Sequence, residues 1–360
     1  MKKYKSIHLV KLSALILFAM IIVLCGIGFL VIHTYINKVN LITDDSRNEI
    51  IEPNYSEGEI QETLAEKTPD ITNSPQNEIN ALDQEIHQNT EDKQTIQKSK
   101  DVYNVLLIGG DSRQAGGTGR SDSMIIVSIN TKTKKIVLTS LLRDIYLKIQ
   151  DHANNRLNAA YAYGGADLLM DTIEENFKID IDKYVAIDFY AFIDVVNSIN
   201  GVTLEVTDQD IPIINYYIEE INLHNGEDES KDLLTQAGSY VLNGKQTLGY
   251  VRNRYNGTDF KRTARQRIVL EKIFDKVTDL NLIELKNLSD KVLPQVTTNL
   301  SEKKILSLLL SLPIYKDYEI VQWSIPMDDT YSLLTINHMS VIRIDFIKNL
   351  KELHKMVYED

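Results

Sequence analysis

The stretch YNVLLIGGDSRQAGGTGRSDSMIIVSINTKTKKIVLTSLLRD, residues 103–144, decides the fold. It holds three apolar runs, at 103–109, 123–130 and 135–142, which are typical of buried strands. The polar turn TKTK separates the second run from the third, so these two runs are expected to pair antiparallel. The stretch therefore predicts neighbouring strands of one sheet.

Beyond this stretch the chain alternates helical and extended patterns. Helical spacing runs over 165–177, 190–199, about 243–252 and 260–280, and strand patterns occupy 184–189, 202–206 and 318–325. Strands interleaved with helices predict an α/β/α sandwich around a central mixed β-sheet. We expect one extracellular catalytic domain over 101–360, with its motifs in 104–267.

The N-terminal region predicts a membrane anchor. Residues 12–32, LSALILFAMIIVLCGIGFLVI, are uninterruptedly apolar and long enough to cross a bilayer. No small-x-small cleavage site follows, which favours a transmembrane helix over a cleaved signal peptide. Lysine is concentrated before the span, so residues 1–11 are expected in the cytoplasm and the rest of the chain outside the cell. Cys25, the single cysteine, lies in the span, so no disulfide is expected in the exported part.

Residues 33–100 are predicted to form an extracellular stalk. They are acidic and rich in Asn, Gln, Ser and Thr, with few aromatic residues and no sustained apolar period. Such a composition does not offset the entropy lost on ordering, which indicates a disordered or loosely helical segment. Within it, NEINALDQEIHQN (77–89) is compatible with a short helix or a coiled-coil fragment.

Arginine is distributed unevenly in this chain, whose net charge is -12. Within 101–360, every arginine except Arg343 lies either between Arg113 and Arg156 or between Arg252 and Arg267. Because lysine solvates a surface equally well, the clustering favours a use of the planar guanidinium group. Ion pairs within the protein are the alternative explanation.

The segment 260–280 places part of the second cluster on a helix. Its inward apolar stripe continues toward the N-terminus through Gln266 and Arg262, with Arg265 beside it. A buried arginine needs an anionic partner. Arg267 projects away from the stripe and is expected on the surface. Asp259 fits either an N-cap or a catalytic carboxylate.

Carboxylates mark the ends of the three N-terminal strands. Asp111 and Asp122 flank a glycine-rich loop that lacks the Gly-Lys-Ser/Thr of a nucleotide-binding loop. They can share one cation, and all-oxygen ligation suits Mg²⁺ or Mn²⁺; an ordinary solvated turn is the alternative. Arg143 and Asp144 end the third strand, where open α/β sheets place their sites, although a rim salt bridge would look the same.

These groups indicate a phosphorylated ligand. The sequence shows no Ser-His-Asp or Cys-His arrangement and no zinc spacing among its histidines, which disfavours acyl transfer. Clustered arginines with a possible metal suit phosphoryl transfer, in which positioning and charge neutralisation provide most of the catalysis.

Five sequence blocks resemble the LytR-CpsA-Psr family of Gram-positive cell walls. In family order over 104–267 they are NVLLIGGDSR, GRSDSMIIVSINTKTKKIVLTSLLRD, NRLNAAYAYGG, INGVTLEV and YVRNRYNGTDFKRTARQR. The resemblance implies an α/β/α sandwich with an apolar pocket for a prenyl tail. It also implies a phosphotransferase that moves a teichoic acid- or capsule-like glycopolymer from a polyprenyl-pyrophosphate carrier to peptidoglycan through a phosphodiester.

The resemblance also implies roles for individual residues. Asp111 and Asp122 match magnesium ligands, and Asp144 and Asp259 match site carboxylates that help deprotonate the acceptor. The residues that match the pyrophosphate site are Arg113, Arg120, Arg143, Arg252, Arg254, Arg262 and Gln266, and Arg265 is expected at its edge. The sequence departs from the family pattern at Leu142, Gly110 and Lys261, which blurs the polymer specificity but removes no charged group.

Three other functions are compatible with parts of the sequence. A polyprenyl-pyrophosphate hydrolase needs the same charges. A membrane-bound transcriptional attenuator needs a basic surface, whereas the 101–360 domain is acidic and expected outside the cell, so no nucleic-acid partner is expected. A non-catalytic wall-polymer binding module is the third. The apolar segment ILSLLLSL (305–312) is expected in the core rather than in contact with lipid.

Overall fold

The computed structural model describes residues 40–41, 72–92, 95–110, 121–254 and 258–359. At its centre are β2 (Val102–Gly110), β3 (Ser121–Asn130) and β4 (Lys135–Leu141), which pair antiparallel in sequence order. These strands coincide with the three predicted apolar runs, and residues 131–134 form the turn between β3 and β4.

The flanking strands make the sheet mixed. Its order is β1-β10-β7-β2-β3-β4-β11. On one side β7 (Lys183–Ile187) is parallel to β2, followed by the short strands β10 (Thr297–Thr298) and β1 (Asn40–Leu41). On the other side β11 (Glu319–Ile325) is parallel to β4. The prediction of a mixed α/β fold with a central mixed sheet is therefore confirmed.

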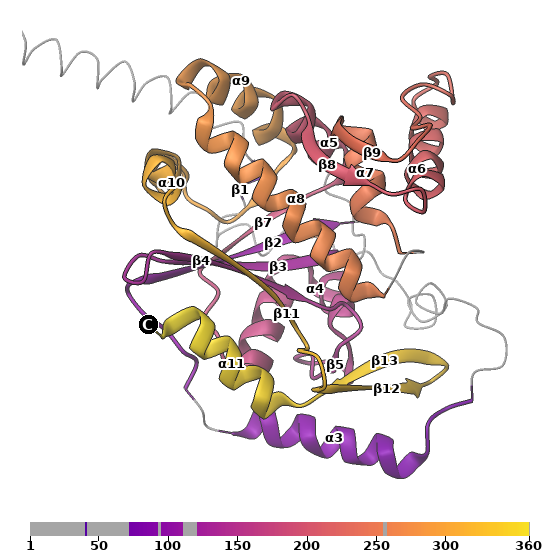
Figure 1. The fold of residues 1–360 in the computed structure, drawn as a ribbon. Coiled ribbons are helices and arrows are strands. Elements are labelled where there is room, and N and C mark those ends of the chain that lie inside the picture. The colour runs from indigo at the N-terminus through magenta and orange to yellow at the C-terminus, as the bar shows by residue number, and fades with distance from the viewer. Residues whose placement is uncertain (1–39, 42–71, 93–94, 111–120, 255–257, 360) are drawn as a thin grey trace, which may run out of the picture.

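Helices cover both faces of this sheet (Figure 1). On one face lie α4 (Leu157–Phe177) and α11 (Phe346–Tyr358), and on the other lie α8 (Asp259–Asp279) and α10 (Glu302–Tyr315). Side chains alternate along a strand, so Leu106 of β2 joins the core with α4 while Leu107 packs with Leu270 of α8. Both faces of the strands are thus apolar.

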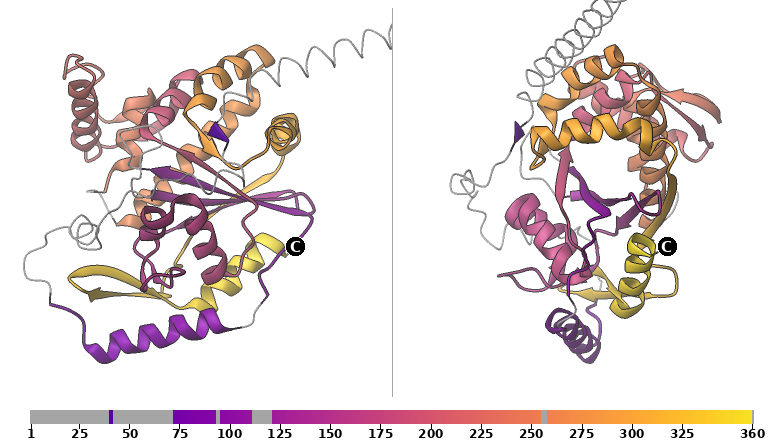
Figure 2. Two further views of the ribbon diagram at one scale, coloured as in Figure 1. Left: turned by 180° about the vertical axis from the view of Figure 1, so that it is seen from behind. Right: turned by 90° about the vertical axis from the view of Figure 1, so that its left-hand side faces the viewer.

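A second lobe stands above the α8 side of the sheet (Figure 2). It comprises α5 (Phe189–Ser198), α6 (Ile211–His224), α7 (Gly244–Arg252), α9 (Leu282–Val292) and the hairpin of β8 (Val202–Val206) with β9 (Gly238–Leu242). The helix predicted over 190–199 is confirmed as α5, which ends just before the turn at Asn200-Gly201. Gly201 has φ +74°, and a Cβ there would lie 2.5 Å from the carbonyl oxygen of Leu242, so only glycine fits the turn.

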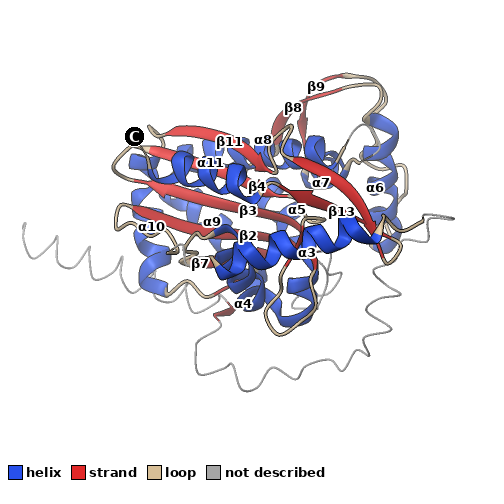
Figure 3. Ribbon diagram, turned by 90° about the horizontal axis from the view of Figure 1, so that it is seen from below, coloured by secondary structure: helices blue, strands red, loops and turns tan. Residues whose placement is uncertain are grey.

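Short elements complete the fold on the α4 side. The hairpin of β12 (Tyr331–Ile336) with β13 (Met339–Ile344) lies against α3 (Gln76–Glu91), as Figure 3 shows. The remaining elements are β5 (Tyr146–Leu147), β6 (Asn155–Arg156) and the 3₁₀ turn η2 (Leu293–Gln295).

The predictions for the membrane span and for the stalk have different outcomes. The predicted span at 12–32 lies outside the described residues, and among the described residues no helix is long and apolar enough to cross a bilayer. Part of the predicted stalk is folded instead. α3 buries Leu82 and Ile86 completely in the main core. Two such residues one turn apart are too few for a sustained period, which is why the sequence did not predict that α3 joins the domain.

Candidate active site

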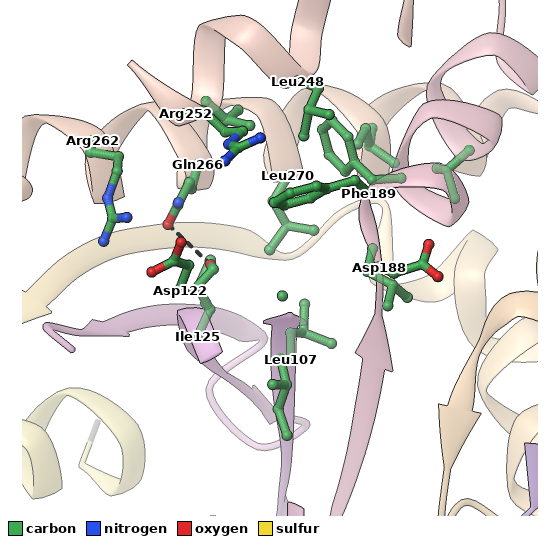
Figure 4. Close-up of a pocket in the computed structure, with 18 of the residues that line it drawn as sticks. Leu107, Asp122, Ile125, Asp188, Phe189, Leu248, Arg252, Arg262, Gln266 and Leu270 are labelled. Carbon is green, nitrogen blue, oxygen red and sulfur yellow. Dashed lines mark hydrogen bonds between the residues drawn. The ribbon is translucent and has the colours of Figure 1, made fainter. Parts of the chain in front are cut away.

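A cavity of about 400 Å³ lies between the sheet and the second lobe. Its floor is formed by β2, β3 and β7, and its roof by α5, α7 and α8. The interior is apolar, and its lining includes Leu107, Ile125, Val185, Phe192, Leu270 and Ile273. One end is polar and carries arginines together with Asp122 (Figure 4). An apolar chain can therefore bind in the interior of the cavity and an anion at its polar end.

Asp122 is the centre of the polar end. Its Oδ1 accepts a hydrogen bond from Nη1 of Arg143 at 2.9 Å and another from Nη2 of Arg254 at 3.1 Å. These three side chains come from the start of β3, the end of β4 and the segment after α7. Burial alone would raise the pKa of Asp122, but attraction to Arg254, Arg143 and Arg262 outweighs it, so the pKa lies below its usual value. Asp122 is therefore ionised at neutral pH.

Arg143 and Asp144 belong to a chain of ion pairs. Asp144 accepts a hydrogen bond from Nη1 of Arg156 at 3.1 Å, and its other oxygen lies 3.5 Å from Nε of Arg143. Burial lowers the pKa of Arg143, but Asp144, Asp122 and Asp259 together raise it above its usual value. No role was predicted for Arg156. Its place within the first arginine cluster was the available signal, but the contact depends on β6 pairing back onto β5.

The first turn of α8 adds a second buried ion pair. Arg262 is only 2 % exposed, and its Nη2 lies 2.9 Å from Oδ1 of Asp259. The N-cap of α8 is Thr258, so the N-cap role considered for Asp259 is wrong by one residue. Asp259 is the first helical residue, and its carboxylate is turned to Arg262. The prediction that Arg262 faces inward is confirmed.

Two other predicted residues line the cavity. Gln266 points from α8 toward β3, where its Oε1 accepts a hydrogen bond from Ser123 at 3.0 Å (Figure 4). Arg252 is held between two aromatic rings, with its guanidinium carbon 4.3 Å from the Phe189 centroid and 4.4 Å from that of Tyr217. Cation–π contacts of this kind fix the orientation of a guanidinium group. The two aromatic partners were not predicted from the sequence.

Arg265 and Arg267 lie elsewhere. Arg265 does not line the cavity, because its guanidinium donates to Asp210 and to the carbonyl of Asn253. This side chain braces the end of α7, so Arg265 is not among the residues that we place at the pyrophosphate. Arg267 was expected on the surface but is only 7 % exposed. Burial lowers its pKa to about 10. The helical projection was wrong here because α8 is covered on two sides, by the sheet and by the second lobe.

Comparisons with known proteins place this arrangement in a family. The sequence profile of the LytR_cpsA_psr family matches residues 70–355. The chain belongs to the LytR-CpsA-Psr family. It is 34% identical over 228 residues to the polyisoprenyl-teichoic acid–peptidoglycan teichoic acid transferase TagT of Bacillus subtilis, covering 62% of this chain and 68% of TagT.

Two further comparisons agree. The polyisoprenyl-teichoic acid–peptidoglycan teichoic acid transferase TagV of Bacillus subtilis is 30% identical over 66% of this chain. The alignment spans 60% of TagV, less than two thirds of its length. A structure of the LytR-CPS2A-psr family protein YwtF (TagT) with bound octaprenyl pyrophosphate lipid has a TM-score of 0.54 at 29% identity, covering 74% of this chain and 93% of that one. The family match begins at residue 70, so it includes α3.

Three predicted residues of this LytR-CpsA-Psr protein, Asp111, Arg113 and Arg120, lie outside the described residues. Among the residues that are described, no group of three or more His, Cys, Asp or Glu side chains is placed to hold a metal. Asp122 is nevertheless a suitable metal ligand. Its Oδ1 accepts both arginine hydrogen bonds, while Oδ2 accepts none from the described part of the chain. A carboxylate with one oxygen free is a suitable ligand for a hard cation.

Proposed function

We propose that this protein transfers a teichoic acid- or capsule-like glycopolymer from its polyprenyl-pyrophosphate carrier to peptidoglycan, forming a phosphodiester. The observation that carries the proposal is the division of the cavity into an apolar interior and an arginine-rich end. A polyprenyl pyrophosphate has this same division. The proposal is supported by the names of TagT and TagV, which describe teichoic acid transferases, and by the octaprenyl pyrophosphate bound in the related structure.

The reaction follows from the charges at the polar end. A hydroxyl oxygen of the acceptor forms a bond to the glycan-side phosphorus while the bond from that phosphorus to polyprenyl phosphate breaks. Negative charge grows on the leaving phosphate, and Arg143, Arg254 and Arg262 are positioned to neutralise it. Asp122 holds two of these arginines in place without substrate, so they need little reorganisation when phosphate oxygens arrive. The reaction consumes no nucleotide, because the pyrophosphate bond is already activated.

Two carboxylates remain candidates for taking the acceptor proton. Asp144 is oriented by Arg143 and Arg156, and Asp259 by Arg262. Neither lines the cavity, but each is paired with an arginine that does, so both lie beside its polar end. Replacement of each by asparagine tests the assignment. The general base is the carboxylate whose loss lowers kcat without weakening the binding of polyprenyl pyrophosphate.

We further propose that the enzyme uses Mg²⁺, or Mn²⁺, held by Asp122 and Asp111. The assignment is supported by Oδ2 of Asp122, which accepts no hydrogen bond from the residues that the structure describes. When bound, the ion supplies additional positive charge for the pyrophosphate oxygens. Magnesium titrated into wild-type protein and into Asp122→Ala, followed by calorimetry, measures the site independently of activity. Equal affinity in the two proteins would remove Asp122 from the site.

The predicted location completes the proposal. The apolar span at 12–32 anchors the protein by a single pass, with the N-terminus in the cytoplasm and the catalytic domain outside. Protease treatment of intact protoplasts is the test. Digestion of the domain agrees with an extracellular location. Full protection would place the domain in the cytoplasm, where a transcriptional attenuator would act.

The transfer itself is tested with purified full-length protein, a polyprenyl-pyrophosphate-linked glycan, and peptidoglycan. We expect released polyprenyl phosphate and glycan attached to peptidoglycan in equal amounts. Release that is equally fast without peptidoglycan would identify a hydrolase instead. Arg143→Ala should abolish most of the transfer, and Arg343→Ala is the matched control, because Arg343 pairs with Glu85 on the opposite layer. A non-catalytic wall-polymer binding module would keep its polymer binding in both variants.

A further inference from the structure

α10 is apolar on two opposite sides. Toward the sheet, Ile305 is buried and packs with neighbours that include Tyr103 and Val185. Away from the sheet, Leu310 and Ile314 are 68% and 60% exposed, while Leu309, one turn after Ile305, is 37% exposed at the edge of the packed side. The expectation that 305–312 lies in the core is therefore confirmed on one side of the helix only. Leu310 and Ile314 form the outer α10 face, beside the exposed Lys303 and Ser307. A helix that is apolar all round is normally covered on all sides, and in the described residues nothing covers this face.

α10 exposes more large apolar side chains than any other described helix or strand. Three of the twelve large apolar side chains that are exposed among the described residues belong to α10. α6 exposes Tyr216 and Leu223, but these accompany Glu219 and the acidic residues 227–229. The ends of α10 carry Lys303, Lys304 and Lys316 beside Glu302 and Asp317, so their net charge is slightly positive. Exposed apolar groups between cationic residues are the pattern of a helix that lies on a phospholipid surface.

The topology brings the predicted anchor to this side of the molecule. β1 pairs with β10, and β10 is the strand that directly precedes α10. Residues 33–39 alone separate the predicted span from β1, and a connection of that length reaches about 25–30 Å at most. A bilayer entered at residue 32 is therefore close to β1. Figure 1 shows β1 and α10 on the same side of the sheet, away from the start of α8.

We propose that the outer α10 face docks on the anionic phospholipid surface of the membrane in which the chain is anchored. Leu310 and Ile314 enter the boundary between headgroups and acyl chains, and Lys303, which is exposed on the same side of the helix, reaches the headgroups. Lys316, just after the end of the helix, pairs with Asp279. The inference rests on the proposed anchor, and it does not require the transfer activity.

Docking in this way orients the cavity. α10 covers the beginning of β2, where Lys304 Nζ lies 3.4 Å from the ring centroid of Tyr103. The arginines gather at the other end of the strand, six residues further along at Gly109, or about 20 Å away. The cavity lining along α8 runs from Arg262 to Ile273, in the direction of the α10 side. The apolar end of the cavity then lies nearer to the bilayer, and the arginines face the cell wall.

The test uses the full chain with Cys25→Ser, which leaves no other cysteine to label. Cysteine is introduced at Ile314 in one protein and at Ile347 in another, and each is labelled with an environment-sensitive nitrobenzoxadiazole dye. Ile347 is the matched control, because it is an isoleucine of α11 that is 83% exposed on the opposite layer. Both proteins are reconstituted into vesicles of phosphatidylglycerol and phosphatidylethanolamine, with and without doxyl-labelled phospholipid.

We expect the dye at position 314 to show a blue-shifted emission and to lose fluorescence when doxyl lipid is present, and the dye at position 347 to do neither. Equal quenching at the two positions would overturn the proposal. A blue shift at position 314 without lipid quenching would also overturn it, because the face would then be covered by protein, either the anchor of the same chain or a second copy. Transfer activity, measured on the same samples, reports separately on the proposed function.

Discussion

The helices α8 and α10 cover the same face of the sheet. Each departs from the rule that apolar side chains face inward and charged ones outward, but in opposite ways. α8 turns charge inward, burying Arg262 and Arg267 at 2 % and 7 % exposure. α10 turns apolar groups outward, with Leu310 and Ile314 more than half exposed. Buried charge requires an anion and an exposed apolar surface requires cover. Arg262 and the outer α10 face are the places where we propose that this protein meets another molecule, a pyrophosphate at the first and the bilayer at the second.

The strongest test of the comparison removes the buried charge at the cavity. Arg262→Ala is expected to lower kcat for transfer by about 10²–10³-fold, because one fixed positive group is lost where negative charge develops. Steady-state release of polyprenyl phosphate measures it, and thermal unfolding checks that the variant folds. Arg343→Ala should keep nearly full activity. A loss below tenfold for Arg262→Ala would mean that this arginine serves only its ion pair with Asp259.

The next test compares the two sides of α10. Ile305→Ala is expected to lower the free energy of unfolding by about 2–3 kcal/mol, since it removes buried methyl groups and leaves a cavity. Ile314→Ala should change it by less than about 0.5 kcal/mol, because the side chain is exposed in the isolated protein. Urea denaturation in detergent measures both. A large loss at Ile314 would show that protein, rather than lipid, covers the outer α10 face.

Within α8, Arg267 can be separated from Arg262. Its Nε and Nη1 are buried and have no hydrogen-bond partner among the described residues, and Arg267 does not line the cavity. Arg267→Met is therefore expected to leave transfer unchanged and to raise the free energy of unfolding by about 1–2 kcal/mol, because an apolar chain of similar length loses no hydration. Chemical denaturation and the transfer assay are run on the same preparation. A severe loss of transfer would instead assign Arg267 a part in the site.

The smallest expected effect concerns pH. The folded-state pKa of Asp122 lies below its unfolded value, so its contribution to stability is complete above the unfolded pKa of about 3.9 and is lost as pH falls toward the folded pKa. The difference in unfolding free energy between wild type and Asp122→Asn should therefore shrink as the pH is lowered below about 4. A difference that stays constant down to the acid limit would show that the arginines do not hold this carboxylate ionised.

Much of the fold and part of the site followed from sequence. β2, β3 and β4 were predictable because each is an unbroken apolar run bounded by turn residues. The inward direction of Arg262 and Gln266 followed from the phase of the apolar stripe on α8. The contribution of Arg156 was not predictable, because it depends on a two-residue pairing of β5 with β6. Nor was the clamp of Asp210 and Asn253 on Arg265, which joins segments far apart in the chain.

The sequence by itself determined the central strands and the main helices, the inward direction of Arg262 and Gln266, and where arginine is concentrated. Those properties depend on local periodicity and on composition, which are fixed within a few turns of chain. Only the tertiary structure decided that Arg267 is buried, that Arg265 braces α7, and that one side of α10 stays exposed. Each of these depends on what packs against an element, and the neighbour is chosen by sheet order and lobe placement rather than by the helix itself.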